Sequence, residues 1–179
     1  MKRTIKKDLF RYNGQTSIRK GLKIDGFKYT YYLRMSSASK RISFKGAYYR
    51  FILKKLRYKY SIQIPIKTDI GEGLFIGHFG MIVINERAKI GKNCNIAHSV
   101  TIGQTNRGKR KGCPTIGNKV WIGTGSVIVG NISIGSNVLI APNTYINSNI
   151  PDNSIVTGNP FVVIPRENAT EDYINFFID

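Results

Sequence analysis

The stretch that decides the fold runs from Pro114 to Ile146 and reads P-T-I-G-N-K-V-W-I-G-T-G-S-V-I-V-G-N-I-S-I-G-S-N-V-L-I-A-P-N-T-Y-I. Within it an isoleucine stands at every sixth position from Ile116 onward. A six-residue period fits neither an α-helix, with about 3.6 residues per turn, nor a strand that alternates about every two. It is typical of a β-helix of hexapeptide repeats.

The same period extends toward the N-terminus. The repeat isoleucines are Ile64, Ile70, Ile76, Ile82, Ile90, Ile96, Ile102, Ile116, Ile122, Ile128, Ile134, Ile140 and Ile146. The position four residues later is often small or apolar, as at Cys94, Val120 and Val138. We expect a triangular prism whose core these two sets fill, each isoleucine contributing about 1.5 to 3 kcal/mol on burial, so that a polar residue at Ile128 is severely destabilising.

Glycine follows the isoleucine in several repeats, where we expect a tight turn to need its backbone freedom. These glycines are Gly71, Gly77, Gly91, Gly103, Gly117, Gly123 and Gly135.

Two irregularities interrupt the repeat. The next repeat isoleucine comes eight residues after Ile82, which predicts an outward bulge around residues 85–87. It comes fourteen residues after Ile102, which predicts a loop that leaves the prism over residues 104–115. The loop carries four cations, which favours an arm that binds an anion or an acceptor over a plain solvated excursion. These cations are Arg107, Lys109, Arg110 and Lys111.

His78 and His98 are the two histidines, and each lies two residues after a repeat isoleucine. Their separation of 20 residues equals one coil of three hexads plus the two-residue bulge. We therefore expect them at the same corner of neighbouring coils, about 4.8 Å apart along the backbone. Spacing alone leaves each one open as an inert surface residue or a base. No metal site is expected, because two histidines lack further ligands at suitable spacing.

The first 60 residues have a different character. They hold 18 Lys or Arg against two Asp, a net charge of +16, and 12 of the 20 aromatic residues. Spacing predicts a basic amphipathic helix from Gly46 to Ser61. The aromatic run over Gly26–Met35 fits a short helix or a strand, and of the two we assign a helix. A segment of this kind can bind an anionic membrane surface, form a helical cap with a solvated basic face, or, ranked lowest, bind nucleic acid.

Composition places the chain among folded proteins. It has 179 residues, 41% of them apolar, and a formal charge of +18. Two cysteines, the absence of an apolar run of membrane-span length and an N-terminus without a signal-peptide pattern predict a cytoplasmic protein. Cys94 is read as core and Cys113 stays open. We expect a basic region over residues 1–60, a β-helix over 61–164, and an acidic tail over 165–179 that folds back on the basic region of its own or a neighbouring subunit.

Four stretches carry a family resemblance. They are G-L-F-I-G-H-F-G-M-I-V-I-N-E-R-A-K-I-G at 73–91, S-V-T-I-G-Q-T at 99–105, P-T-I-G-N-K-V-W-I-G-T-G-S at 114–126 and P-D-N-S-I-V-T-G-N-P at 151–160. Over residues 61–164 the chain resembles the serine acetyltransferase-type hexapeptide acyltransferases, and most of all the shorter members encoded with bacterial capsule and exopolysaccharide synthesis. The resemblance implies a mainly β fold, a left-handed parallel β-helix, a homotrimer, and acetyl-CoA as co-substrate in a groove between subunits.

The resemblance also implies roles for single residues. His78 matches the general base that takes the acceptor's hydroxyl proton. Residues that match the binding surface for coenzyme A are Gln104, Thr105, Thr124 and Pro142. Charge alone adds Lys109, Arg110, Lys111 and Arg166 as partners for its phosphates. His98, Glu86, Gln63 and Cys113 are candidates for a supporting or acceptor-binding role.

Three departures bear on the acceptor. Serine acetyltransferases have Asp where this chain has Gly77, an Arg-His pair where it has Gly112 and Cys113, and Asp where it has Gln63. Those groups recognise an amino acid and orient the base. We therefore expect acetyl transfer to a sugar hydroxyl of a surface-polysaccharide precursor, with peripheral contact to the inner membrane face. The alternatives are serine O-acetylation for cysteine synthesis and, from another class, a non-catalytic β-helix that scaffolds partners or binds nucleic acid.

Overall fold

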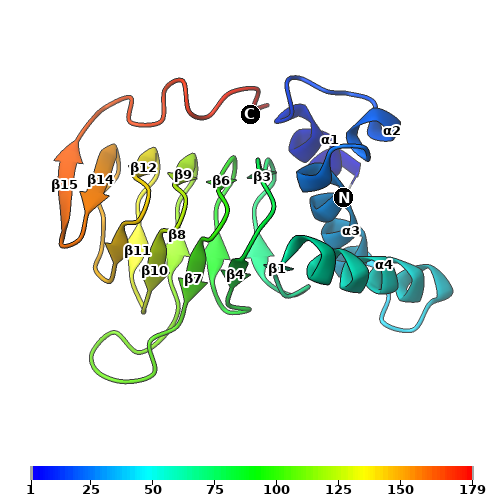
Figure 1. Ribbon diagram of the computed structural model, residues 1–179, viewed down its shortest axis with the longest axis horizontal. Coiled ribbons are helices and arrows are strands. Elements are labelled where there is room, and N and C mark those ends of the chain that lie inside the picture. Colours follow the sequence, from blue (N-terminus) through cyan, green and yellow to red (C-terminus); the bar gives the residue numbers. More distant parts are fainter. Residues whose placement is uncertain (1, 179) are drawn as a thin grey trace.

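The repeat region forms a three-sided coil of short parallel strands in the computed structural model, which describes residues 2–178 (Figure 1). The first sheet contains β1 (Ile62–Gln63), β4 (Ile82–Ile84), β7 (Thr101–Gly103), β10 (Val127–Val129) and β13 (Tyr145–Ile146). The second contains β2 (Asp69–Ile70), β5 (Lys89–Ile90), β8 (Thr115–Ile116) and β11 (Ser133–Ile134). The third contains β3 (Phe75–Ile76), β6 (Asn95–Ile96), β9 (Val120–Ile122), β12 (Val138–Ile140), β14 (Ser154–Gly158) and β15 (Phe161–Pro165). The parallel β-helix predicted from the six-residue period is therefore confirmed.

Both predicted sets of inward residues form the core. Isoleucines stack in register from coil to coil, as in the pairing of Ile102 with Ile128, and twelve of the thirteen are buried. The prediction is wrong for Ile70, which is half-buried. Its strand β2 is the last of the second sheet and has only β5 beside it, so one side of Ile70 is not covered by another coil.

The glycines that follow the isoleucines are not there for the backbone freedom that was predicted. None of them has a positive φ. Most instead lack room for a side chain, since a Cβ at Gly91 would lie 2.4 Å from the carbonyl oxygen of Gly117, one coil further on. The left-handed corner conformation falls on other residues, among them Asn93 and Asn137, with φ of 56° and 54°. Asparagine tolerates that conformation better than most residues.

Both predicted interruptions are present. Residues 85–87 form an outward turn, which the Ala88 N–H closes by donating to the Asn85 carbonyl at 3.1 Å. The long excursion projects from the coil between β7 and β8 (Figure 1). Thr105 and Gly112 pair in both directions at 3.0 Å and so close its base.

Within residues 2–178, four helices close the N-terminal end of the coil. They are α1 (Lys2–Phe10), α2 (Ile18–Gly21), α3 (Asp25–Ala38) and α4 (Phe44–Tyr60). The two predicted helices correspond to α3 and α4, each slightly longer than expected. Tyr29, Leu53 and Tyr60 belong to the same apolar cluster as the first coils, so α3 and α4 extend the core of the coil. The helical region also has a second, smaller apolar cluster, formed by Ile5, Leu9, Tyr12 and Phe27. None of the helices within residues 2–178 combines the length and the apolarity that crossing a bilayer requires.

Asp8 fastens α1 to the first coil. One carboxylate oxygen accepts the N–H groups of Gly73 at 2.7 Å and Leu74 at 2.9 Å, and the other accepts Nε of Arg34 in α3 at 2.8 Å. Burial raises the pKa of Asp8, while Arg34 and the two amides oppose that shift. The contact joins two helices and the coil through one buried side chain.

The C-terminal segment runs back along the coil to the helices (Figure 1). Its Tyr173 packs edge-on against Trp121, with ring centroids 5.1 Å apart, and Nε of Arg11 donates to the Asn175 carbonyl at 2.9 Å. The predicted return of the tail to the basic region is therefore found, within its own subunit.

Candidate active site

One edge of the prism collects four of the predicted site residues. His78 follows β3, His98 follows β6, Thr124 follows β9 and Pro142 follows β12, so all four stand at the corner where the third sheet turns into the first. Backbone hydrogen bonds hold this column together, including the Gly125 N–H to the His98 carbonyl at 3.2 Å. The stacked coils place these side chains in one line parallel to the coil axis.

The two histidines meet at this edge. Their ring centroids lie 6.1 Å apart and the rings are nearly perpendicular, at 89°. The predicted placement on neighbouring coils is confirmed. His78 is exposed, whereas His98 is half-buried and its Nδ1 is buried without a hydrogen-bond partner in the described chain.

Among the residues that the structure describes, the histidine pair has no acidic partner. Within residues 2–178, no carboxylate oxygen lies within 4.0 Å of either imidazole. Imidazole titrates near neutral pH, so an exposed neutral ring can accept a proton from a hydroxyl. Within the described residues, the arrangement therefore offers a proton acceptor without a carboxylate beside it.

Helix α4 braces the corner that holds His78. Tyr60, its last residue, stacks on Phe79 with centroids 5.3 Å apart and planes 30° apart, and the Tyr60 hydroxyl donates to Oδ1 of Asp25 at 2.5 Å. Burial, reinforced by Asp25, raises the pKa of Tyr60. This contact was not predictable, because no repeat or spacing in the sequence relates a residue of the helical region to a corner of the coil.

A second group of predicted residues lies at the other edge of the first sheet. There Oε1 of Gln104 accepts hydrogen bonds from Asn85, at 3.4 Å, and from the Arg87 guanidinium. Sγ of Cys113 donates to Oδ1 of Asn85 at 3.3 Å. The bulge and the base of the loop therefore form one polar cluster. Sequence reasoning found the bulge but assigned no role to Asn85 or Arg87.

The remaining candidates are dispersed around these two edges. Glu86 is exposed on the bulge, and Gln63 is exposed on β1, beside Val83 of the next coil. Thr105 stands at the base of the loop.

The predicted phosphate partners do not form one group. Lys109 and Lys111 are exposed on the loop, while the Arg110 guanidinium turns back and donates to the Asn147 carbonyl. Arg166 stands just after β15 on the third sheet, where its N–H donates to the Asn153 carbonyl at 2.7 Å. Within one subunit, Arg166 is therefore separate from the two edges that hold the other candidates.

Comparison with known proteins decides the family. The model of the bacterial transferase hexapeptide (six repeats) matches residues 113–148. A serine acetyltransferase of Helicobacter pylori is 36% identical over 118 residues, which make up 66% of this chain and 69% of that protein. The chain belongs to the serine acetyltransferase-like hexapeptide-repeat acyltransferases. Membership places it among the acetyltransferases.

Solved structures agree with this fold. The serine acetyltransferase of Brucella abortus in complex with coenzyme A superposes with a TM-score of 0.77 at 24% identity, covering 92% of this chain and 68% of that one. The enzyme of Neisseria gonorrhoeae in complex with serine superposes with a TM-score of 0.74 at 27% identity, covering 91% and 68%. The coil of this chain is accordingly the left-handed β-helix of hexapeptide repeats.

Proposed function

We propose that this chain is an acetyl-CoA-dependent O-acetyltransferase in which His78 is the general base. His78 takes the proton of the acceptor hydroxyl as that oxygen attacks the thioester carbonyl; the tetrahedral intermediate then collapses and the coenzyme A thiolate leaves. The acetyl group moves directly to the acceptor, without a covalent enzyme intermediate. The observation that carries this proposal is the exposed imidazole of His78 on the edge shared with His98, Thr124 and Pro142.

Acetyl-CoA is proposed to lie along that edge. The pantetheine arm is proposed to run along the stacked coils beside Thr124 and Pro142. Gln104 and Thr105, at the other edge of the first sheet, would face it from a neighbouring subunit. Turn N–H groups such as those at residues 123–125 are suited to stabilise the oxyanion. The exposed Lys109 and Lys111 supply charge for the phosphates.

We propose a homotrimer with the site between subunits. A second chain against the first sheet would bring one subunit's histidine edge toward its neighbour's loop. It could also supply the group that orients His78 and the missing partner of the buried His98 Nδ1. The free thiols of Cys94 and Cys113 suit a reducing compartment, which supports a location in the cytoplasm.

Two acceptors are supported by different observations. The names of the relatives favour L-serine, which this chain would acetylate on its hydroxyl. The second candidate is a sugar hydroxyl of a surface-polysaccharide precursor. Gly77, Gln63 and Cys113 favour it, because they cannot supply the charges that an ammonium and a carboxylate require.

A thiol-release assay tests the proposal. The purified chain is incubated with acetyl-CoA and, in separate reactions, L-serine, a set of nucleotide-sugars and lipid-linked glycans. We expect coenzyme A release that depends on one acceptor class. Turnover on serine alone would assign the first acceptor, and turnover on a sugar alone would assign the second. No measurable affinity for acetyl-CoA, together with nucleic-acid binding through residues 1–60, would replace the enzyme proposal with a binding function.

A further inference from the structure

Helix α4 exposes a stripe of large side chains on its solvent side. Phe44, Tyr48, Phe51 and Tyr58 follow one another at helical spacing, with exposed fractions of 98%, 55%, 55% and 77%. Ile42, in the turn before the helix, is 94% exposed. Scattered apolar residues on a surface need no explanation, but a continuous stripe of this kind marks an interaction surface.

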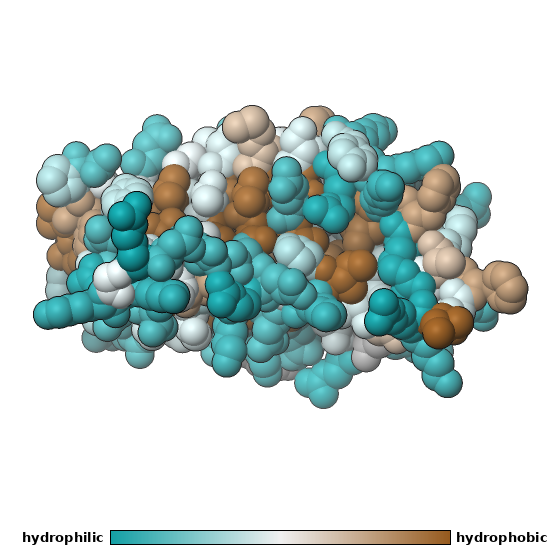
Figure 2. Space-filling view, turned by 90° about the horizontal axis from the view of Figure 1, so that it is seen from below, coloured by the Kyte–Doolittle hydropathy of each residue, from teal (hydrophilic) through white to brown (hydrophobic). Residues whose placement is uncertain are grey.

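The same helix is strongly cationic. No Asp or Glu stands between Asp25 and Asp69, whereas residues 40–59 hold eight Lys or Arg. In the part of the chain that the structure describes, none of these eight forms an ion pair. Figure 2 shows the face that includes α4, where brown side chains stand among teal ones at the right-hand end. The surface therefore combines unneutralised positive charge with exposed aromatic rings.

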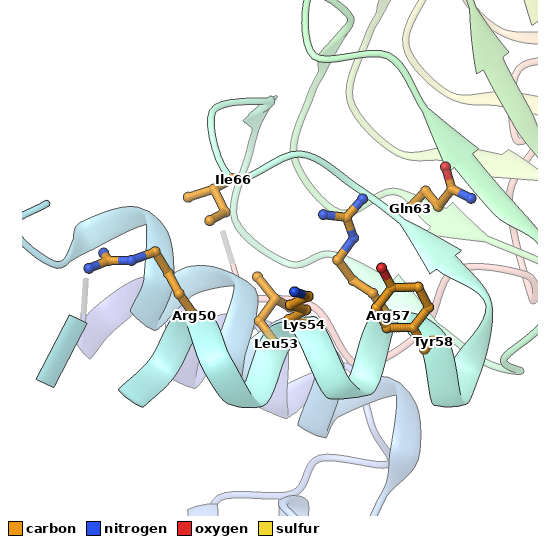
Figure 3. Close-up of a pocket in the computed structure, with 7 residues that line it drawn as sticks. All are labelled: Arg50, Leu53, Lys54, Arg57, Tyr58, Gln63 and Ile66. Carbon is orange, nitrogen blue, oxygen red and sulfur yellow. The ribbon is translucent and has the colours of Figure 1, made fainter. Parts of the chain in front are cut away.

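Beside the stripe, three cations line a groove of about 380 Å³ between α4 and the first coil (Figure 3). Arg50, Lys54 and Arg57 lie on one side of the helix, at the spacing that brings residues of successive turns together. Leu53 and Ile66 contribute apolar surface to the same groove. Like charges held this close repel one another, so an anion in the groove relieves an unfavourable arrangement.

We propose that α4 and the turn before it dock the chain on an anionic lipid surface. Phe44, Tyr48, Phe51 and Tyr58 lie in the interfacial layer, and the groove of Arg50, Lys54 and Arg57 receives lipid phosphate groups. A basic helix with aromatic residues along one side is the composition of helices that lie in the plane of a membrane interface. The helix lies on the bilayer and does not cross it.

Two other binding partners for this surface, a second copy of the chain and a nucleic acid, fit it less well. A second copy of this chain would bring two such cationic helices face to face, without acidic side chains on either to compensate. Single-stranded nucleic acid is normally held in a cationic groove whose aromatic rings stack with bases. Here Tyr58 alone of the four stripe rings lines the groove of cations, while Phe44, Tyr48 and Phe51 lie outside it along the outer side of the helix.

The docking surface ends close to the candidate base, since Tyr60 at the end of α4 stacks on Phe79, the neighbour of His78. On the proposed function, a membrane-bound acceptor would thus reach the site directly. The docking itself is independent of that function and is measured without acetyl transfer.

Vesicle co-sedimentation of the full chain tests the docking. The probes are phosphatidylcholine vesicles with and without phosphatidylglycerol. One variant carries Arg50→Gln, Lys54→Gln and Arg57→Gln, and a matched control loses the same charge through Arg19→Gln, Lys20→Gln and Lys23→Gln in and after α2, at the opposite side of the helical region (Figure 1). We expect binding to anionic vesicles only, weakened at least about tenfold by the groove variant and much less by the control.

A second variant separates the stripe from the charge. Phe44→Ser with Phe51→Ser keeps every cation, and we expect it to lose the vesicle binding that the unmodified chain retains in high salt. Circular dichroism melting confirms that the variants are folded. Equal losses in the two charge variants would overturn the proposal, as would equal binding to vesicles with and without phosphatidylglycerol. Binding to an oligonucleotide but not to vesicles would also overturn it, in favour of nucleic acid.

Discussion

The two thiols of the chain have contrasting surroundings. Cys94 is fully buried in the coil, where its Sγ lies 3.3 Å from the Gly117 carbonyl oxygen, and burial raises its pKa to about 11. Cys113 is half-buried at the base of the loop. Since the thiolate is the reactive form, the two should react at very different rates.

We predict that at pH 8 a thiol reagent modifies one cysteine of the native chain rapidly and the other only slowly. Cys113→Ser should remove the rapid phase, and unfolding in guanidinium should make both thiols reactive. Because the pKa of Cys94 is raised on folding, its contribution to stability falls as the pH rises from about 9 through about 11. Rapid modification of Cys94 in the native chain would contradict its burial.

Helix α3 is seated directly on the coil. A Cβ at Gly26 would lie 1.9 Å from the carbonyl oxygen of Ile76 in β3, so backbone packs against backbone where the helical region joins the first coil. Gly108, on the loop, has a φ of 79° and open space around it. Glycine is therefore required at Gly26 by packing and at Gly108 by backbone conformation.

We predict that Gly26→Ala lowers the free energy of unfolding by about 3 kcal/mol, at the upper end of typical overpacking costs, because main-chain atoms must move. Gly108→Ala should cost about 1 kcal/mol, from its left-handed backbone alone. Urea unfolding followed by circular dichroism measures both. A loss at Gly26 no larger than that at Gly108 would show that α3 is not held against β3 in this way.

Elements that repeat were predictable, and contacts between unlike elements were not. Every six-residue repeat places an isoleucine in the core and a turn at the corner. The period therefore predicted the three-sided coil, the bulge at residues 85–87 and the proximity of His78 to His98. The Asp8 contact with Gly73 depends on how α1 docks 65 residues away, and no sequence pattern encodes that distance. The repeat glycines were predicted from their backbone freedom, but the structure shows that most of them are needed because the next coil leaves no room for a side chain. The period shows where glycine recurs, but not which atoms lie close to it.

Most of the positive charge of the molecule lies at one end of the coil. The helical region carries most of the positive charge, while the candidate base stands at the corner where that region meets the first coils. Residues of each edge of the first sheet come from different coils, so stacking of the coils brings them together. In the homotrimer that we propose, a neighbouring subunit completes the site. This arrangement makes the imidazole of His78 the feature on which the account depends.

The most direct measurement is therefore kcat/KM for acetyl transfer by His78→Ala, made with the acceptor that the thiol-release assay identifies. Analytical ultracentrifugation of the same samples reports whether the assembly is intact, and His98→Ala is the matched histidine control. We predict a loss of about 10² to 10⁴ in rate for His78→Ala, with assembly unchanged, and a smaller loss for His98→Ala. A His78→Ala variant that assembles normally and retains its rate within about threefold would contradict the assignment of His78 as the base.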